Sequence, residues 1–304
     1  MSAPPRLFDR ALHRRRLDRA APGYGAADFL KARAATDAVE RLETIMRSFP
    51  LAVDLGARNG AFAAALAQSD AKDRVGALIE ADLSARMLAG RDGMRVQADE
   101  ERLPFADESL DLVVSTLSLH WTNDLVGALI QIRRVLKPDG LFLGAILGGQ
   151  TLVELRQCLL QAESELSHGA GLRVSPFADV LDAAGLLQRA GLALPVADAD
   201  RVTVRYANAL ELIREVRAMG ESNVLHDRAR KPISRAVLAR AAMIYQDRFA
   251  AADGRIAATF DIVSLTGWAP HPDQQQPLRP GSAKMRLADA LKTQEFPAGE
   301  KGGA

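Results

Sequence analysis

The chain has 304 residues, of which 48% are hydrophobic and 25% are charged. These proportions are ordinary for a folded globular protein, and the length suits one large α/β domain or two small domains. Lys and Arg number 39 and Asp and Glu number 38, so the formal net charge is +1, and we expect no nucleic-acid partner. The single cysteine, Cys158, excludes an internal disulfide and a cysteine-based zinc site and is typical of a reducing cytoplasm.

The first 20 residues are locally basic, because they hold six arginines and only two aspartates. The early Asp9 argues against a transit peptide, and the segment lacks the apolar core of a secretory signal. We therefore expect residues 1–30 to form a helical segment that packs over a functional site. The basic run Arg14–Arg16 either lies on a solvated helix face or meets an acidic partner.

Short apolar runs rich in β-branched residues alternate with helical periods from about residue 49 to residue 147. The expected strands are Phe49–Leu55, Val75–Ile79, Met94–Ala98, Leu110–Ser115 and Leu141–Leu147. The expected helices are Ala61–Ala67, Leu83–Ala89 and Leu125–Val135, with a turn at Lys137–Gly140 before the fifth strand. This alternation predicts a doubly wound parallel sheet.

The second half of the chain adds helices and two further strands. We expect helices at Thr151–Leu166, Phe177–Ala190, about 207–219 and about 234–249, and strands at Arg201–Tyr206 and Ala257–Thr266. Residues 270–304 are rich in Pro, Gln, Gly and charge, which predicts an extended or disordered tail. We expect a single domain over 31–269, in which a helical insertion at about 149–176 and the N-terminal segment together form a lid.

Acidic residues follow three successive predicted strands. Asp54 opens the turn of the sequence VDLGARNG, where Gly56 and Gly60 permit the positive φ angles and close approach that a bound ligand requires. Asp82 follows the second strand and could accept both hydroxyls of a ribose, whereas Asp99 and Glu100 follow the third strand and could take an adenine amino group. Together they predict a nucleoside site at the carboxyl edge of the sheet.

Each of these residues also has a plainer interpretation. Asp54 and Asp82 could be helix N-caps, and Asp99 with Glu100 could be a solvated charge cluster. Two further residues, His120 and Trp121, lie at the mouth of the predicted site. His120 could act as a base, or it could be a packed residue beside a lid anchor, Trp121.

The remaining histidines show no metal-ligand spacing, so we expect no metal site and expect His13, like the others, to lie at the surface. The sequence MGESN, Met219–Asn223, either caps a helix at Gly220 or places Glu221, Ser222 and Asn223 on the acceptor side of the site.

Several sequence stretches together resemble a known family. In chain order, VDLGARNG, ADLSARML, ADEERLPF, ESLDLVVS and LKPDG resemble the motifs of class I S-adenosylmethionine-dependent methyltransferases of type 11. The stretches LFDR, STLSLHWTNDLVGAL, GGQTL, SPF and MGESN resemble the arginine-hydroxylase family of respiratory complex I assembly factors, which has a methyltransferase fold. That family is related to the malonyl-carrier-protein methyltransferases of biotin synthesis.

The resemblance implies a Rossmann-like three-layer sandwich with a seven-stranded, mostly parallel sheet, a helical lid and an antiparallel edge strand at Ala257–Thr266. The implied cofactor is S-adenosylmethionine. Its implied binding residues are Asp54, Gly56, Arg58, Gly60, Asp82, Asp99, Glu100 and Ser115. Arg58 departs from the superfamily pattern, which has glycine there, so its side chain either excludes the cofactor or pairs with the cofactor's carboxylate.

The implied partner is a protein substrate, a subunit of complex I, with peripheral contact to a membrane complex. The implied activity is modification of that subunit during assembly, and the family is associated with arginine hydroxylation rather than with a demonstrated methyl transfer. Two alternatives remain open: an O-methyltransferase for a small molecule or carrier protein, and a non-catalytic scaffold with a degenerate cofactor site.

Overall fold

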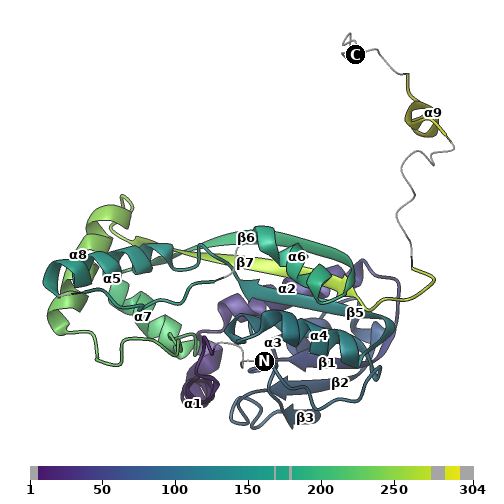
Figure 1. Cartoon of the computed structure of the whole chain (residues 1–304), viewed down its shortest axis with the longest axis horizontal. Coiled ribbons are helices and arrows are strands. Elements are labelled where there is room, and N and C mark those ends of the chain that lie inside the picture. Colours follow the sequence, from purple (N-terminus) through teal and green to yellow (C-terminus); the bar gives the residue numbers. More distant parts are fainter. Residues whose placement is uncertain (1–5, 168, 178–179, 275–284, 295–304) are drawn as a thin grey trace. The chain divides into compact units, whose positions relative to one another are not determined.

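The computed structural model describes residues 6–167, 169–177, 180–274 and 285–294 (Figure 1). The chain divides into two units, Met1–Pro270 and His271–Ala304. The second unit contains a short helix, α9 (Leu287–Leu291), among its described residues. The predicted extended tail otherwise falls largely outside the described residues, and the predicted domain bounds stay a prediction.

The first unit is built on a sheet whose described strands are arranged in the order β3-β2-β1-β4-β5-β7-β6. Strands β1 to β4 pair in parallel with their neighbours, as do β4 and β5, whereas β7 is antiparallel to both β5 and β6. The predicted seven-stranded, mostly parallel sheet is therefore confirmed. The strands are β1 (Phe49–Leu55), β2 (Val75–Asp82), β3 (Met94–Gln97), β4 (Leu110–Thr116), β5 (Leu136–Leu147), β6 (Ala193–Tyr206) and β7 (Ile256–Trp268).

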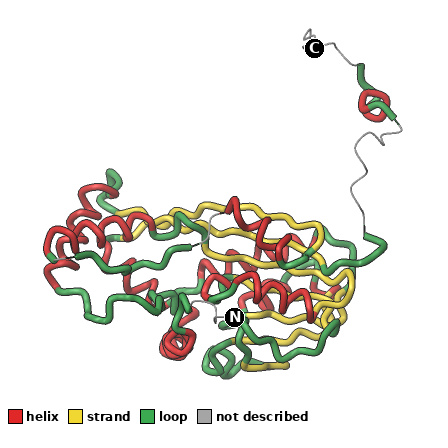
Figure 2. Tube along the Cα trace, viewed as in Figure 1, coloured by secondary structure: helices red, strands yellow, loops and turns green. Residues whose placement is uncertain are grey.

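Helices cover both faces of this sheet, as Figure 2 shows. Successive residues of a strand point to opposite faces, and both faces are apolar here. Ala52 and Leu112 pack with α2 and α3, whereas Val53 and Val113 pack with α4 and α6. The result is the expected three-layer sandwich. The helices are α1 (Arg10–Ala20), α2 (Phe29–Glu43), α3 (Ala61–Ala67), α4 (Leu125–Val135), α5 (Val153–Leu166), α6 (Val180–Arg189), α7 (Ala209–Ala218) and α8 (Arg235–Phe249).

The insertion predicted at about 149–176 contains α5, which forms a separate apolar cluster with α7 and α8 against the last two strands. That this insertion and the N-terminal segment act as a lid stays a prediction. Leu155, Leu212 and Tyr245 from the three helices pack with Phe260 of β7 in this cluster. Short 3₁₀ turns complete the unit at η1 (Ala21–Ala26), η2 (Lys72–Arg74) and η3 (Leu119–Trp121). The cluster places α5 and α7 beside the end of the sheet where the site lies.

The position of the last strand differs from the prediction. Ala257–Thr266 lies within an antiparallel strand, but β7 occupies the interior between β5 and β6, and β6 is the edge strand. The burial patterns give the physical reason. The side chains of β7 are almost continuously buried, whereas those of β6 alternate between half-buried and exposed, which suits a strand with one open side.

The predicted helix at Leu83–Ala89 is wrong, because the segment forms turns. The Asp82 carboxylate accepts a hydrogen bond from the Ser84 N–H at 2.8 Å, and Gly90 follows with a φ of 74°. So short a segment between two such constraints cannot nucleate a stable helix. The predicted turn at Lys137–Gly140 is also different, since these residues are part of β5, where the pairing with β4 shifts register.

Candidate functional site

The turn between β1 and α3 has three residues with positive φ: Gly56 at 78°, Arg58 at 54° and Gly60 at 74°. A Cβ added to Gly56 would lie 2.3 Å from the Cβ of Ser118, so only glycine fits there. The N–H groups of Gly56 and Ala57 both donate to the carbonyl of Ala81, at 2.7 and 3.0 Å. These contacts bind the turn to the end of β2.

The Arg58 side chain is fully buried and points into the predicted nucleoside site. Its Nη1 donates to Asp82 Oδ2 at 2.7 Å, and its backbone N–H donates to the same oxygen at 2.9 Å. Burial by itself lowers the pKa of Arg58, but the charge of Asp82 outweighs this and raises the pKa above its ordinary value. The guanidinium thus neutralises the carboxylate that was predicted to bind ribose.

The position of Arg58 has features of the two alternatives from the sequence, exclusion of the cofactor and pairing with the cofactor's carboxylate. The side chain is directed inward, as the exclusion alternative requires. Its Nε and Nη2 atoms, however, have no hydrogen-bond partner among the described residues. A buried guanidinium with two unused nitrogens could still receive a carboxylate.

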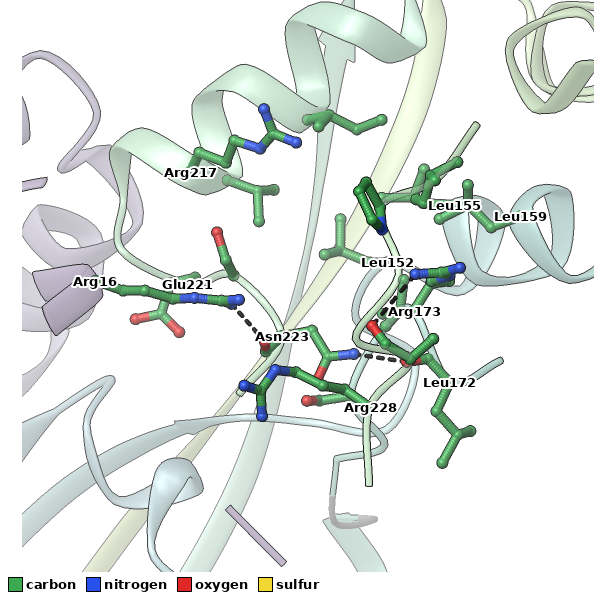
Figure 3. Close-up of a pocket in the computed structure, with 18 of the residues that line it drawn as sticks. Arg16, Leu152, Leu155, Leu159, Leu172, Arg173, Arg217, Glu221, Asn223 and Arg228 are labelled. Carbon is green, nitrogen blue, oxygen red and sulfur yellow. Dashed lines mark hydrogen bonds between the residues drawn. The ribbon is translucent and has the colours of Figure 1, made fainter. Parts of the chain in front are cut away.

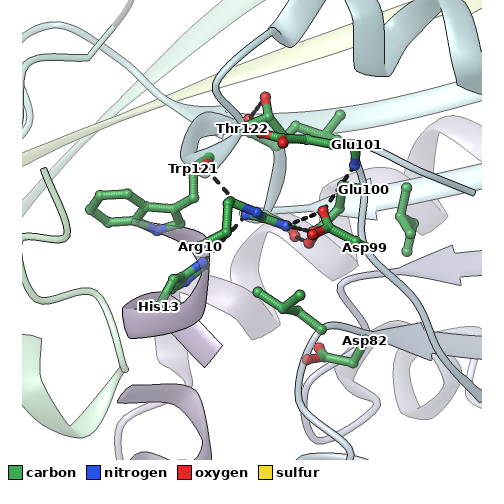
Figure 4. A network of polar contacts seen from close by, with 12 residues as sticks. Arg10, His13, Asp82, Asp99, Glu100, Glu101, Trp121 and Thr122 are labelled. Carbon is green, nitrogen blue, oxygen red and sulfur yellow. Dashed lines mark hydrogen bonds and ion pairs between the residues drawn. The ribbon is translucent and has the colours of Figure 1, made fainter. Parts of the chain in front are cut away.

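Arg10 at the start of α1 neutralises the two acids after β3 (Figure 4). Its Nη2 lies 2.7 Å from Asp99 Oδ1 and also contacts Glu100 Oε2. Glu100 further accepts a hydrogen bond from the Ser118 hydroxyl. Burial by itself raises the pKa of Glu100, but Arg10 and then Arg58 lower it below its ordinary value. The N-terminal segment therefore contacts the predicted site through charged pairs that the sequence did not reveal, and its role as a lid stays a prediction.

Asp54 is fully buried near the end of β1, and neither of its carboxylate oxygens has a hydrogen-bond partner among the described residues. Burial raises the pKa of Asp54 to about 6. Nearby, the buried Lys31 of α2 donates through Nζ to the carbonyls of Gly56 and Thr116, each at 2.6 Å. Burial also lowers the pKa of Lys31 to about 8. Sequence reasoning missed Lys31, because a lysine within an ordinary amphipathic helix carries no local signal of such a role.

His120 and Trp121 lie in η3 and converge on Glu221. The Glu221 carboxylate lies 2.5 Å from Trp121 Nε1 and 3.0 Å from His120 Nε2. The Leu147 N–H points at the other ring nitrogen of His120, Nδ1, at 3.5 Å. Nδ1 therefore acts as the acceptor, and Nε2 carries the proton that is donated to Glu221. A role for His120 and Trp121 in catalysis stays a prediction.

Aromatic packing surrounds Trp121. The rings of Phe8 and His13 each lie 5.3 Å from it, centroid to centroid. The expectation that His13 lies at the surface is wrong, because this side chain is fully buried; its position on α1 faces inward when the helix covers the site. Ser115 in β4 is also buried, and its hydroxyl donates to the Leu55 carbonyl at 2.8 Å.

These side chains have the properties that an amino-acid nucleoside would need. Asp54 offers a buried carboxylate that has no hydrogen-bond partner among the described residues, which suits an ammonium group. Asp82, Asp99 and Glu100 offer acceptors for hydroxyl and amino groups, although arginines now hold them. The residues present therefore fit such a cofactor once Arg10 and Arg58 move away from the carboxylates.

Comparison with known proteins defines the class. Residues 53–144 match the family described as "Methyltransferase domain". The fold is similar to that of Haemonchus contortus phosphoethanolamine N-methyltransferase 2 in complex with S-adenosylhomocysteine. The TM-score is 0.51 at 16% sequence identity, and the match covers 85% of this chain and 60% of that one. With its strand order and glycine turn, the chain is a protein of the class I methyltransferase fold.

Two relatives narrow the assignment. The chain is 40% identical over 293 residues to "Arginine-hydroxylase NDUFAF5, mitochondrial" of Danio rerio, covering 94% of this chain and 90% of that protein. It is 32% identical to a malonyl-[acyl-carrier protein] O-methyltransferase of a Methylovorus species, covering 97% of each. The chain belongs to the NDUFAF5 family. No helix in the part that the structure describes has the length and apolar character to cross a bilayer.

Proposed function

We propose that this chain binds S-adenosylmethionine at the carboxyl ends of β1, β2 and β3 and modifies a subunit of respiratory complex I during assembly. The observation that carries the proposal is the approach of Asp82, Asp99 and Glu100 to one inward-facing pair of arginines beside the glycine turn. Membership of the NDUFAF5 family supports the assembly role, and the hydroxylase name of those relatives supports a protein substrate.

Each part of the site would hold one part of the cofactor. Asp54, Gly56 and Gly60 would bind the methionine end, Asp82 would accept the ribose hydroxyls, and Asp99 with Glu100 would accept the adenine amino group. Ser115 would support this site from β4 by binding the turn-bearing strand β1. S-adenosylmethionine supplies an already activated methyl group, so the protein contributes mainly orientation and exclusion of water.

On the acceptor side, Trp121 would exclude water, while His120 would hold a proton at Nε2 against the Glu221 carboxylate. We place the reaction in the cytoplasm, at the peripheral part of a membrane complex. Transfer of a methyl group needs only the proposed cofactor, whereas hydroxylation of an arginine would also need dioxygen and two electrons from a reductant. Both reactions are compatible with a protein acceptor.

A deletion strain tests the assembly role. Loss of the gene should lower the amount of assembled complex I, and normal complex I in the deletion strain would reject the proposal. Mass spectrometry of complex I subunits should show one methyl group or one oxygen atom missing in the deletion strain.

Calorimetric titration with S-adenosylmethionine tests the cofactor. Micromolar affinity would support an enzyme, whereas no binding up to millimolar concentration would favour the non-catalytic scaffold. Complementation with Asp82→Ala provides the matched test in cells, because a pure scaffold should restore assembly without cofactor binding.

A carrier-protein O-methyltransferase is the second candidate, because the Methylovorus relative carries that name and aligns over nearly all of both chains. Rescue of a strain that lacks the methyltransferase of biotin synthesis would favour this activity. Failure of that rescue, together with loss of complex I in the deletion strain, would favour the first.

A further inference from the structure

A large cavity lies beside the nucleoside site, between α1, α5, α7 and the segment 221–233 (Figure 3). Its volume is about 760 Å³, within the usual range for small-molecule sites. Trp121 and Glu221 form the wall nearest to the nucleoside site, since the Trp121 carbonyl accepts a hydrogen bond from Arg10 at 3.2 Å. The proposed cofactor chemistry does not use the rest of this cavity.

The floor of the cavity is apolar. Leu152, Leu155 and Leu159 from the α5 region are buried, as is Val216 from α7, and all four side chains line the cavity. Figure 3 shows Leu155 and Leu159 on one side of the space and Arg217 and Arg16 on the other. Such a floor favours contact with an apolar chain.

The rim of the cavity is strongly basic. Among the described lining residues, seven carry positive charge and two carry negative charge. Apart from Arg173, which pairs with Glu163, the cationic residues of the rim are Arg16, Arg19, Arg217, Arg228, Arg230 and Lys231.

Most of this charge lacks a counter-ion. Arg228 approaches Asp9 at 3.8 Å, whereas Arg19, Arg217, Arg230 and Lys231 form no ion pair with any described residue. Arg16 is half-buried and donates to the carbonyl of Asn223 rather than to an acid. Burial, followed by the charges of Arg228, Arg19 and Arg217, lowers the pKa of Arg16, so the cations crowd one another.

We propose that this cavity binds an anionic amphiphile, an apolar chain that ends in a phosphate or carboxylate. The chain would lie on the leucine floor, and the basic rim would hold the anionic group. Unpaired guanidiniums are well suited to phosphate and carboxylate, because several N–H donors share one plane. The site stands on this chain's own residues and does not depend on cofactor binding.

Calorimetry with decyl phosphate, kept below its aggregation concentration, tests the proposal on the full chain. We expect saturable binding at least tenfold tighter than that of decanol, which lacks the charge, or inorganic phosphate, which lacks the chain. The double variant Arg217→Gln/Arg230→Gln should weaken binding at least tenfold. The matched control Arg33→Gln/Arg205→Gln removes two exposed arginines outside the cavity and should leave binding unchanged.

Three results would overturn the proposal: no saturation up to millimolar decyl phosphate, equal binding of decanol, or equal affinity in the rim variant and wild type. The ligand could be a free amphiphile or the headgroup of a membrane lipid. Sedimentation with phosphatidylglycerol vesicles distinguishes these two sources. Capture by vesicles without binding of monomeric decyl phosphate would assign the rim to a membrane surface and reject the cavity site. The same variants should bind S-adenosylmethionine as tightly as the wild type does. Failure of the cavity proposal can therefore be told apart from failure of the proposed function.

Discussion

Replacement of Arg58 by glycine is the most informative perturbation of this protein. In the folded chain the guanidinium and the Asp82 carboxylate are both fully buried, with 2.7 Å between Nη1 and Oδ2. The substitution leaves Asp82 with two backbone donors, the N–H groups of residue 58 and Ser84. Removing one partner of a buried pair costs about 3–5 kcal/mol of folding free energy, because the other charge remains buried.

Glycine also relieves the backbone at this position. Arg58 has a φ of 54°, and a non-glycine residue in that region costs about 1 kcal/mol. We therefore expect the free energy of unfolding of Arg58→Gly to fall by about 2–4 kcal/mol in the absence of cofactor.

Cofactor affinity should change in the opposite direction. In the wild type, the ribose must displace Arg58 from Asp82, whereas in the variant it finds an unpaired carboxylate. A gain of about 1.4–3 kcal/mol corresponds to a tenfold to roughly hundredfold tighter dissociation constant for S-adenosylmethionine. The thermal stabilisation by the cofactor should also be larger in the variant than in the wild type.

Calorimetric titration and thermal unfolding of both proteins measure these effects. Arg201→Ala is the control, since it removes an arginine that pairs with Asp261 in the outer strands and should not alter cofactor affinity. Weaker binding of S-adenosylmethionine by Arg58→Gly would instead show that the guanidinium holds the cofactor's carboxylate.

Asp54 has a pKa of about 6 in the folded protein, against an ordinary value of 3.8. Between these values the folded state retains a proton that the unfolded state releases, so the free energy of unfolding falls as pH rises from about 4 to 6. In urea unfolding, Asp54→Asn should avoid up to about 3 kcal/mol of this loss of stability. If the free energy of unfolding depends on pH equally in the variant and the wild type, Asp54 does not have the raised pKa. Gly56→Ala should destabilise the fold by at least about 2 kcal/mol in the same assay, because its Cβ meets Ser118, while Gly25→Ala, where the space is open, should be nearly neutral. Arg10→Gln should raise cofactor affinity and speed amide hydrogen exchange in α1, and unchanged exchange there would show that this arginine does not anchor the helix.

Much of the architecture was predictable because its causes are local. The apolar runs and helical periods placed β1, β4 and α4 close to their observed bounds, and the glycine turn after Asp54 marked the edge of the sheet that carries the candidate site. Predictions from local composition failed where contacts at the ends of a segment oppose its helical tendency. Leu83–Ala89 has helical composition, yet Asp82 and Gly90 at its two ends hold it in turns.

The alternation of strands and helices and the order in which acids follow the parallel strands could be predicted from the sequence alone, because periodicity acts over a few residues. The family followed from the resemblance of short motifs. The contacts of those acids depend on residues that folding brings together from distant parts of the chain. Arg10 meets Asp99 and Glu100 from far along the chain, and Arg58 turns onto Asp82 rather than outward. The burial of Lys31 and the basic cavity arise in the same way, because they depend on how helices pack against the sheet rather than on any short stretch of chain.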